Sequence, residues 1–169
     1  MQGQDIAVLL KLVLANGEPQ LSKNLAFELC LSPSEISKSL QRSREVGLVY
    51  LNGSEKRVNR SALLELLVHG IKYVFPPQKG GMTRGVATGA AVEPLNELLS
   101  AGTEPPMVWP CAEGRVRGLS FSPLYRGAPQ AALRDKELYR VLALCDAIRD
   151  GRARERNLGS ELLKKALGL

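Results

Sequence analysis

Basic side chains that could bind phosphate groups are concentrated in one segment of this chain. Between positions 37 and 60, six cations stand against two carboxylates, so this segment carries +4 of the net charge of +6. The cations are Lys38, Arg42, Arg44, Lys56, Arg57 and Arg60, and the carboxylates are Glu45 and Glu55. Guanidinium and ammonium groups donate hydrogen bonds to phosphate oxygens. Positive charge concentrated on one module is typical of proteins that contact a nucleic-acid backbone.

The first part of this segment is predicted to be a helix that begins at Pro33. Ser32 is a favourable N-cap, proline suits the first helical position, and Glu35 completes an S-x-x-E capping box. The polar face of this helix carries Ser34, Glu35, Ser37, Lys38, Gln41 and Arg42. Lys38, Gln41 and Arg42 are long enough to reach base edges or phosphates, so this face is the candidate reader of the major groove.

The elements around this helix predict a winged helix-turn-helix. The expected elements are a helix at 5–16, a helix at 21–30 with Leu21 facing inward, a strand at 48–51, a return strand at 58–59 and a closing helix at 60–75. Asn52-Gly53 is a strong signal for the hairpin turn. Lys56 and Arg57 are expected at the hairpin tip, where they could contact the adjacent minor groove or its backbone.

The run LSPSEISKSLQRSREVGLVYL resembles the recognition helix and first wing strand of MarR-type and related winged-helix regulators. The resemblance covers residues 5–75, under half of the chain. It implies sequence-specific binding to double-stranded DNA by a homodimeric transcriptional repressor. The residues expected to contact DNA are Ser32, Ser34, Glu35, Ser37, Lys38, Gln41, Arg42, Arg44, Lys56 and Arg57. Two features depart from the pattern: Ser43 replaces the usual large aliphatic residue, and no long dimerisation helix fits before Asp5.

The segment from 76 to 129 differs in composition from the rest. It contains eight of the ten prolines and eight of the sixteen glycines, together with the only tryptophan, Trp109. We expect an ordered but irregular arm that packs on another surface. The regular structure expected in it is a short helix at 92–100 and a strand pair at 107–109 and 115–121 that turns at Glu113-Gly114. The glycine-rich stretch 80–91 is expected to be rich in turns, because it lacks the G-K-[ST] of a P-loop.

Two helices are predicted at the C-terminal end, at 135–150 and 157–167, with Gly151 as a break between them. The first has an apolar stripe of Leu138, Val141, Leu142, Cys145 and Ile148. This stripe is the candidate dimer interface, the alternative being that it packs the arm onto the N-terminal domain. The basic residues Arg149, Arg152, Arg154 and Arg156 are expected to form a solvated helix face, and the alternative is an auxiliary phosphate contact or docking to an acidic partner.

The sequence therefore predicts a mainly α fold with a small β wing. Its parts are a winged helix-turn-helix domain at 1–75, a Pro/Gly-rich ordered arm at 76–134 and a C-terminal helical segment at 135–169. Cys30, Cys111 and Cys145 are far apart and lack CxxC spacing, so free thiols and no metal site are expected. With one histidine, His69, no catalytic constellation is recognisable, and neither an enzyme nor a cofactor is expected. No signal peptide or membrane span is predicted, which favours a cytoplasmic protein with no membrane partner.

Two functional hypotheses remain open on the sequence. The first is the DNA-binding homodimeric repressor. The second is a protein-interaction subunit, an antitoxin or complex adaptor, that docks a partner protein through the winged helix and the arm. The arm discriminates between them: a regulator that senses a ligand would enclose a pocket there, and an adaptor would expose Trp109 and its apolar neighbours as a patch.

Overall fold

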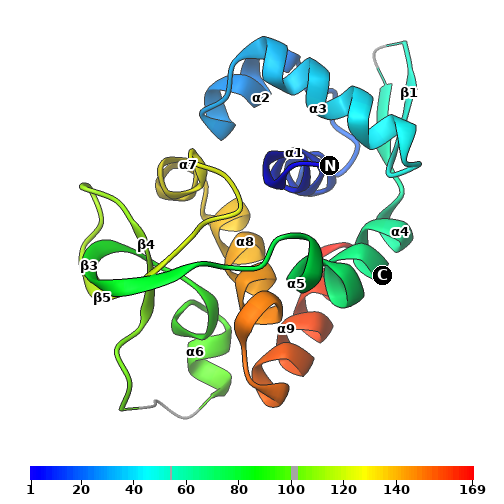
Figure 1. The fold of residues 1–169 in the computed structure, drawn as a ribbon. Helices are drawn as coiled ribbons and strands as arrows, with labels where there is room; N and C mark the ends of the chain where they lie inside the picture. The colour runs from blue at the N-terminus through cyan, green and yellow to red at the C-terminus, as the bar shows by residue number, and fades with distance from the viewer. Residues whose placement is uncertain (54, 100–102) are drawn as a thin grey trace.

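The computed structural model describes residues 1–53, 55–99 and 103–169. Helices account for more than half of the chain, and two small β-structures complete a mixed fold (Figure 1). The N-terminal elements, in chain order, are α1 (Gly3–Leu14), α2 (Ser22–Leu29), α3 (Pro33–Glu45), β1 (Val49–Asn52), β2 (Glu55–Val58), α4 (Arg60–Glu65), a π-helical turn (Leu66–Gly70) and α5 (Ile71–Val74). The predicted order of elements is confirmed in this part.

Two details of the N-terminal part differ from the prediction. Helix α2 begins at Ser22, and the Leu21 side chain is 67% exposed, so the expectation that it faces inward is wrong. The return strand β2 is longer than predicted and includes Lys56 and Arg57, which are therefore strand residues and do not lie at the tip of the hairpin. The strands are in antiparallel register from Val49 opposite Val58 to Asn52 opposite Glu55. Gly53 has a φ of +59°, as the predicted hairpin turn requires.

The proline- and glycine-rich segment contains more regular structure than its composition suggests. Its elements are β3 (Lys79–Ala87), a 3-10 turn (Gly89–Ala91), α6 (Leu95–Leu98), β4 (Met107–Pro110) and β5 (Val116–Phe121). The glycine-rich stretch is thus mostly a strand, and the prediction that it is rich in turns is wrong. The segments expected as strands are strands, but β4 and β5 pair in parallel, so no hairpin turns at Glu113-Gly114. The predicted helix at 92–100 is shorter, and residue 100 lies outside the described residues.

The long strand β3 holds this β-structure together. It pairs antiparallel with β5 along its first part and with β4 through Gly85, Val86 and Ala87, and β4 and β5 close the ring. A ring of three strands has almost no interior, so side chains cannot fill it. A Cβ atom on Gly85 or Gly118 would overlap the backbone carbonyl of Trp109 or Pro106. Glycine is therefore required at these two positions, one in β3 and one in β5, where the strands approach closely.

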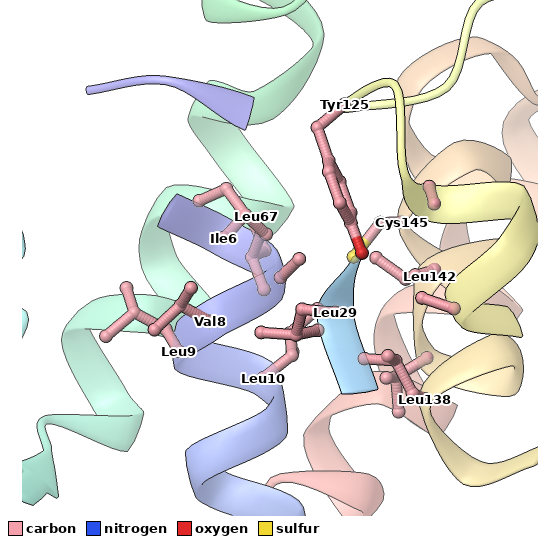
Figure 2. Packing of buried hydrophobic residues seen from close by; sticks show 14 of the residues in the cluster. Ile6, Val8, Leu9, Leu10, Leu29, Leu67, Tyr125, Leu138, Leu142 and Cys145 are labelled. Atoms are coloured by element: carbon pink, nitrogen blue, oxygen red, sulfur yellow. The ribbon is translucent and has the colours of Figure 1, made fainter. Parts of the chain in front are cut away.

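The C-terminal part of the chain forms three helices, of which the long middle one lies at the centre of the molecule. They are α7 (Ala128–Arg134), α8 (Lys136–Asp150) and α9 (Ala153–Ala166), and α8 packs against α1, α5, α7 and α9. The predicted helix 135–150 and the break at Gly151 are confirmed, whereas α9 begins four residues before the prediction. Figure 2 shows Leu138, Leu142 and Cys145 among side chains of the N-terminal helices, including Leu10 and Leu29.

The burial of α8 overturns one prediction. The candidate dimer interface consists of Leu138, Val141, Leu142, Cys145 and Ile148, and each of these side chains is buried within its own chain. A surface already covered by α1 and α7 cannot be shared with a second copy unless the core opens. The stripe therefore packs the C-terminal segment and the arm onto the N-terminal helices, which was the alternative. One cluster of buried apolar side chains runs from Ile6 to Leu167.

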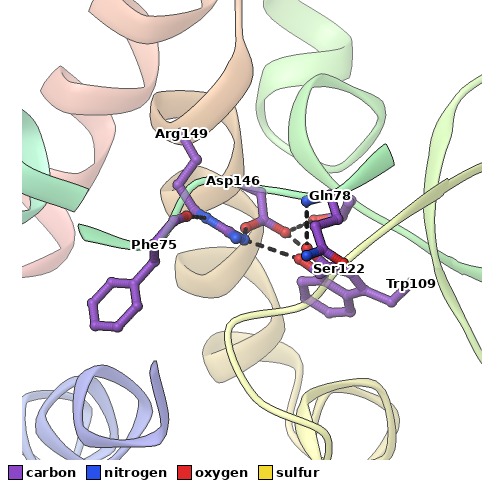
Figure 3. A network of polar contacts seen from close by, with 7 residues as sticks. Phe75, Gln78, Trp109, Ser122, Asp146 and Arg149 are labelled. Atoms are coloured by element: carbon purple, nitrogen blue, oxygen red, sulfur yellow. Dashed lines mark hydrogen bonds and ion pairs between the residues drawn. The ribbon is translucent and has the colours of Figure 1, made fainter. Parts of the chain in front are cut away.

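A buried ion pair joins α8 to the β-ring and to the end of α5 (Figure 3). Asp146 accepts hydrogen bonds from the Trp109 indole nitrogen and the Thr88 hydroxyl, both at 2.7 Å, and from the Arg149 guanidinium at 2.6 Å. Arg149 also donates to the backbone carbonyls of Phe75 and Ser122. Arg149 is only 6% exposed, so the expectation that it belongs to a solvated face is wrong. Both charges have enough partners to offset much of their desolvation.

No helix in the described parts of the chain is long and apolar enough to cross a membrane.

The pair of Asp146 and Arg149 generates a stability prediction. The Asp146→Asn variant should lower the free energy of unfolding by about 3–5 kcal/mol, because it leaves the Arg149 guanidinium buried without a counter-charge. Urea denaturation of the whole chain measures this. Asp150→Asn is the matched control, since Asp150 lies on the same helix and pairs with Lys79 at a partly exposed site. Asp150→Asn should lower the free energy of unfolding by less than about 1 kcal/mol. Equal losses of stability in the two variants would contradict a special role for the buried pair.

Candidate nucleic-acid interface

Helix α3 begins with the capping box that its sequence predicts. The Ser32 hydroxyl accepts from the Glu35 backbone N–H, and the Glu35 carboxylate accepts from both the backbone N–H and the hydroxyl of Ser32 at 2.7 Å. The backbone and hydroxyl hydrogen bonds from Ser32 hold the pKa of Glu35 below its usual value. Ser32 and Glu35, both predicted as DNA contacts, are thus engaged in capping. Their place in the structure assigns them the task of fixing where α3 begins.

The outer face of α3 carries a stripe of polar side chains, which we call the α3 stripe. Its members are Ser34, Ser37, Lys38, Gln41 and Arg44, and all of them are exposed. Within the described residues, the side chains of Lys38 and Arg44 take part in no ion pair or hydrogen bond, whereas Gln41 donates to Glu45 at 3.2 Å. The serines near the start of the helix are short, which lets a partner approach the backbone closely. The stripe therefore offers two cations and one amide on a rigid, capped helix.

Arg42 does not belong to this stripe, so the expectation that it lies on the exposed polar face with Lys38 and Gln41 is wrong. Its guanidinium turns inward and donates two hydrogen bonds to the Asp5 carboxylate, at 2.9 and 2.6 Å. The Asp5 carboxylate is fully buried and also accepts from the backbone N–H of Gln2 at 2.7 Å. Because the paired geometry is directional, this contact fixes the rotation of α3 relative to α1.

Small side chains on the buried face of α3 accompany this pairing. Ser39 and Ser43 are both fully buried, and α1 and α3 are in direct contact. Ser43, which departs from the winged-helix pattern, lies on the buried face of α3 together with Ile36, Ser39 and Leu40.

The hairpin contributes one cation to the same end of the molecule. Arg57 on β2 is exposed and lies opposite Tyr50, whose ring is also exposed. Lys56 points the other way and donates to the backbone carbonyl of Gln20 at 2.7 Å, which ties the hairpin to the loop after α1. Of the two hairpin cations predicted to contact DNA, Arg57 is therefore free to do so and Lys56 is engaged within the chain.

A polar cleft of about 670 Å³ lies between the hairpin and the loop that joins α1 to α2. Lys56, Arg57 and Arg60 line it together with Glu18 and Glu55. Arg60 donates to the backbone carbonyl of Leu167 at 3.1 Å, so the C-terminal end of the chain meets the start of α4 here. Three cations and two carboxylates line this cleft, so its net charge is small and positive.

Sequence reasoning missed Asp5 as the residue that positions α3. Asp5 interrupts the otherwise apolar buried face of α1, which includes Ile6, Leu9 and Leu10. A carboxylate on such a face requires a cation, because an unpaired charge is costly to bury. That signal indicated that one arginine of the basic segment would turn inward, although it could not tell which one.

The remaining reactive groups of the described residues do not form a second chemical centre. Cys111 and Cys145 are buried thiols and Cys30 is half-buried. Burial raises the pKa of Cys145, which makes its thiol a poor nucleophile. Among the residues that the structure describes, no three His, Cys, Asp or Glu side chains are grouped so as to hold a metal ion.

No family model, curated protein or solved structure matches this chain.

The inward orientation of Arg42 predicts a loss of stability in its variant. Arg42→Ala should lower the free energy of unfolding by about 2–3 kcal/mol, because it leaves the Asp5 carboxylate buried without its charged donor. Arg44→Ala is the matched control: the same substitution two residues away on an exposed site should change stability by less than about 0.5 kcal/mol. Chemical denaturation compares the two variants, and a neutral Arg42→Ala would show that the pair with Asp5 contributes nothing.

Because of the pair between Asp5 and Arg42, the difference in free energy of unfolding between the wild type and Arg42→Ala should depend on pH. Burial alone would raise the pKa of Asp5, but the hydrogen bonds from Arg42 and Gln2 outweigh it and hold the pKa below the usual 3.8. The stabilisation is therefore fully present above the unfolded-state pKa and is lost as the pH falls through the lower folded-state pKa. Denaturation at neutral pH and below pH 4 should show the difference shrinking in acid.

Proposed function

We propose that this protein binds double-stranded DNA through α3 and regulates transcription, with α1 to α5 acting as a winged helix-turn-helix and the β1–β2 hairpin as the wing. The observation that carries the proposal is the α3 stripe: a capped helix whose exposed face presents Lys38, Gln41 and Arg44 beside short serines. A helix with such a face fits the major groove of B-DNA, where lysine, arginine and glutamine can bond base edges or phosphates.

The electrostatics and the hairpin support this proposal. Lys38 and Arg44 on α3 and Arg57 on β2 are exposed cations from one continuous segment of the chain, and the net charge of +6 favours an anionic partner. The resemblance of the α3 run to MarR-type regulators is in agreement. Repression follows most simply, since a protein of this size that occupies a promoter excludes other proteins from it.

The alternative hypothesis, a protein-docking adaptor, has less support from the structure. That hypothesis required Trp109 to be exposed within an apolar patch. Trp109 is instead 1% exposed, donates to Asp146 and packs edge-to-face against Tyr139. The arm therefore uses its tryptophan for its own core.

The proposal is tested by the affinity of α3 variants for DNA. Lys38→Ala and Arg44→Ala should each weaken binding, and each should make the dependence of log K on log salt shallower by about one if a phosphate contact is lost. Fluorescence anisotropy with labelled duplexes from the protein's own upstream region, at several salt concentrations, measures both quantities.

Lys164→Ala on α9 is the matched control, because Lys164 is also an exposed helical cation but lies outside α3 and the hairpin. It should leave affinity and salt dependence unchanged. If the α3 variants bind as the wild type does at matched salt, α3 is not the reader and the proposal is wrong.

Assembly is a separate prediction. A single winged helix reads a short site, so specific readers commonly pair across about one turn of DNA, roughly 34–36 Å. We predict a homodimer on this ground, formed by a surface other than α8. Exposed apolar side chains such as Tyr73 and Val74 at the end of α5 are available. Light scattering across a concentration series measures the mass, and a strict monomer at high concentration would favour the adaptor hypothesis.

A further inference from the structure

The outer face of the β-ring carries an unusual group of arginines. Cβ atoms on Gly85, Gly114 and Gly118 would all overlap backbone atoms of neighbouring segments, so these positions face the inside of the ring. Side chains alternate between the two faces of a strand. Arg84 and Arg117, which neighbour these glycines in β3 and β5, therefore face outward, and Arg115 stands immediately before β5. We call these three residues the arginine face. All three side chains are exposed.

The register brings two of these arginines directly together. Arg84 on β3 is the cross-strand partner of Arg117 on β5, and Arg115 lies two residues before Arg117, just ahead of the start of β5. In the parts of the chain that the structure describes, none of the three side chains makes an ion pair or a hydrogen bond. Lys79 on the same strand, by contrast, pairs with Asp150 at 2.6 Å. The arginine face is therefore a concentration of positive charge without compensation.

Such an arrangement has a cost for the fold. Like charges directly opposite one another on paired strands are destabilising. A local conflict of this kind, with no compensating contact in the fold, is typical of a surface whose charges are neutralised by a ligand. The planar guanidinium can donate two parallel hydrogen bonds to phosphate oxygens, which makes arginine well suited to a polyanion.

The surroundings of the arginine face favour contacts to phosphates over the readout of bases. The next outward pair, Met82 opposite Leu119, is aliphatic and offers no aromatic ring on which a base could stack. Contacts to phosphates, without readout of bases, fit these features.

We propose that Arg84, Arg115 and Arg117 bind the sugar–phosphate backbone of duplex DNA, as a sequence-independent contact in addition to the α3 stripe. This rests on the proposed function, because it assumes that DNA is the partner of the chain. The two contacts have separate roles: the α3 stripe can reach base edges, and the arginine face adds affinity for any sequence.

The test uses the full-length protein with the double variant Arg84→Gln/Arg117→Gln and a mixed-sequence duplex of about 30 base pairs, long enough for non-specific binding. Affinity should fall about tenfold, and the slope of log K against log salt should become shallower by about two. The melting temperature should stay the same or rise, because the variant removes a repulsion between like charges. A structural role for these arginines would lower it instead.

The charge-conserving variant Arg84→Lys/Arg117→Lys is the first control and should retain the salt slope of the wild type. If this variant also loses the slope, the loss reflects altered structure and the proposal is overturned. Lys164→Gln is the second control and should change neither the affinity for DNA nor the salt slope. Polyglutamate is a competing probe: arginine-dependent binding to it, with DNA binding unchanged in the glutamine variant, would overturn the proposal in favour of an acidic protein.

Failure of this inference is distinguishable from failure of the proposed function. If Lys38→Ala and Arg44→Ala weaken DNA binding but Arg84→Gln/Arg117→Gln does not, the arginine face is not a DNA contact and only this inference is overturned. If only Arg84→Gln/Arg117→Gln weakens DNA binding, the arginine face is the DNA contact and α3 is not the reader. A wild-type protein that fails to bind any duplex would overturn both.

Discussion

The carboxylate of Asp146 connects three parts of the chain through buried polar contacts. It accepts hydrogen bonds from Trp109 of β4, from Thr88 directly after β3 and from Arg149 of its own helix. Arg149 in turn donates to the backbone carbonyls of Phe75, after α5, and Ser122, after β5. Buried charges require well-placed partners, so the β-ring and the end of α5 have little freedom to shift against α8. Helix α8 can then serve as the common core element for the N-terminal helices and the ring.

A second buried carboxylate has the corresponding effect at the other end of the molecule. Asp5 holds Arg42 and thereby sets which face of α3 is buried. With Arg42 turned inward, the α3 stripe of Ser34, Ser37, Lys38, Gln41 and Arg44 points outward. In both ion pairs an acidic residue on an apolar helix face holds one arginine, but Asp5 holds an arginine of another helix and Asp146 holds one of its own helix.

The consequence for function is a division of the basic residues into two groups. Arg42, Lys56 and Arg149 are engaged within the chain and position its elements. Lys38, Arg44 and Arg57, and separately Arg84, Arg115 and Arg117, are exposed. The proposed DNA-binding function depends on this second group. Helix α8 is covered by its own chain. Self-association would therefore use a surface outside the core.

Local signals in the sequence determined the elements of residues 3–75 and the long C-terminal helix. The capping box at Ser32, the turn at Asn52-Gly53 and the apolar stripe of α8 each depend on neighbours within a few residues, so a sequence contains them in full. Composition alone was misleading for the middle segment. Gly85, in the stretch whose glycines suggested turns, is needed because the strands of the ring approach closely there, and this is a property of partners distant in the chain.

The tertiary structure alone decided which charged side chains face solvent and which pair within the chain. The polar pattern of α3 placed Lys38 and Arg42 on the same face, because helical periodicity does not distinguish a long side chain that points to solvent from one that folds back to a buried partner. Asp5 lies 37 residues away from Arg42, and Asp146 lies 37 residues from Trp109. In the same way, an apolar stripe specifies that a helix face must be covered but not by what. The packing of α1 and α7 on α8 made that choice, because burial within one chain leaves no such surface for a second copy.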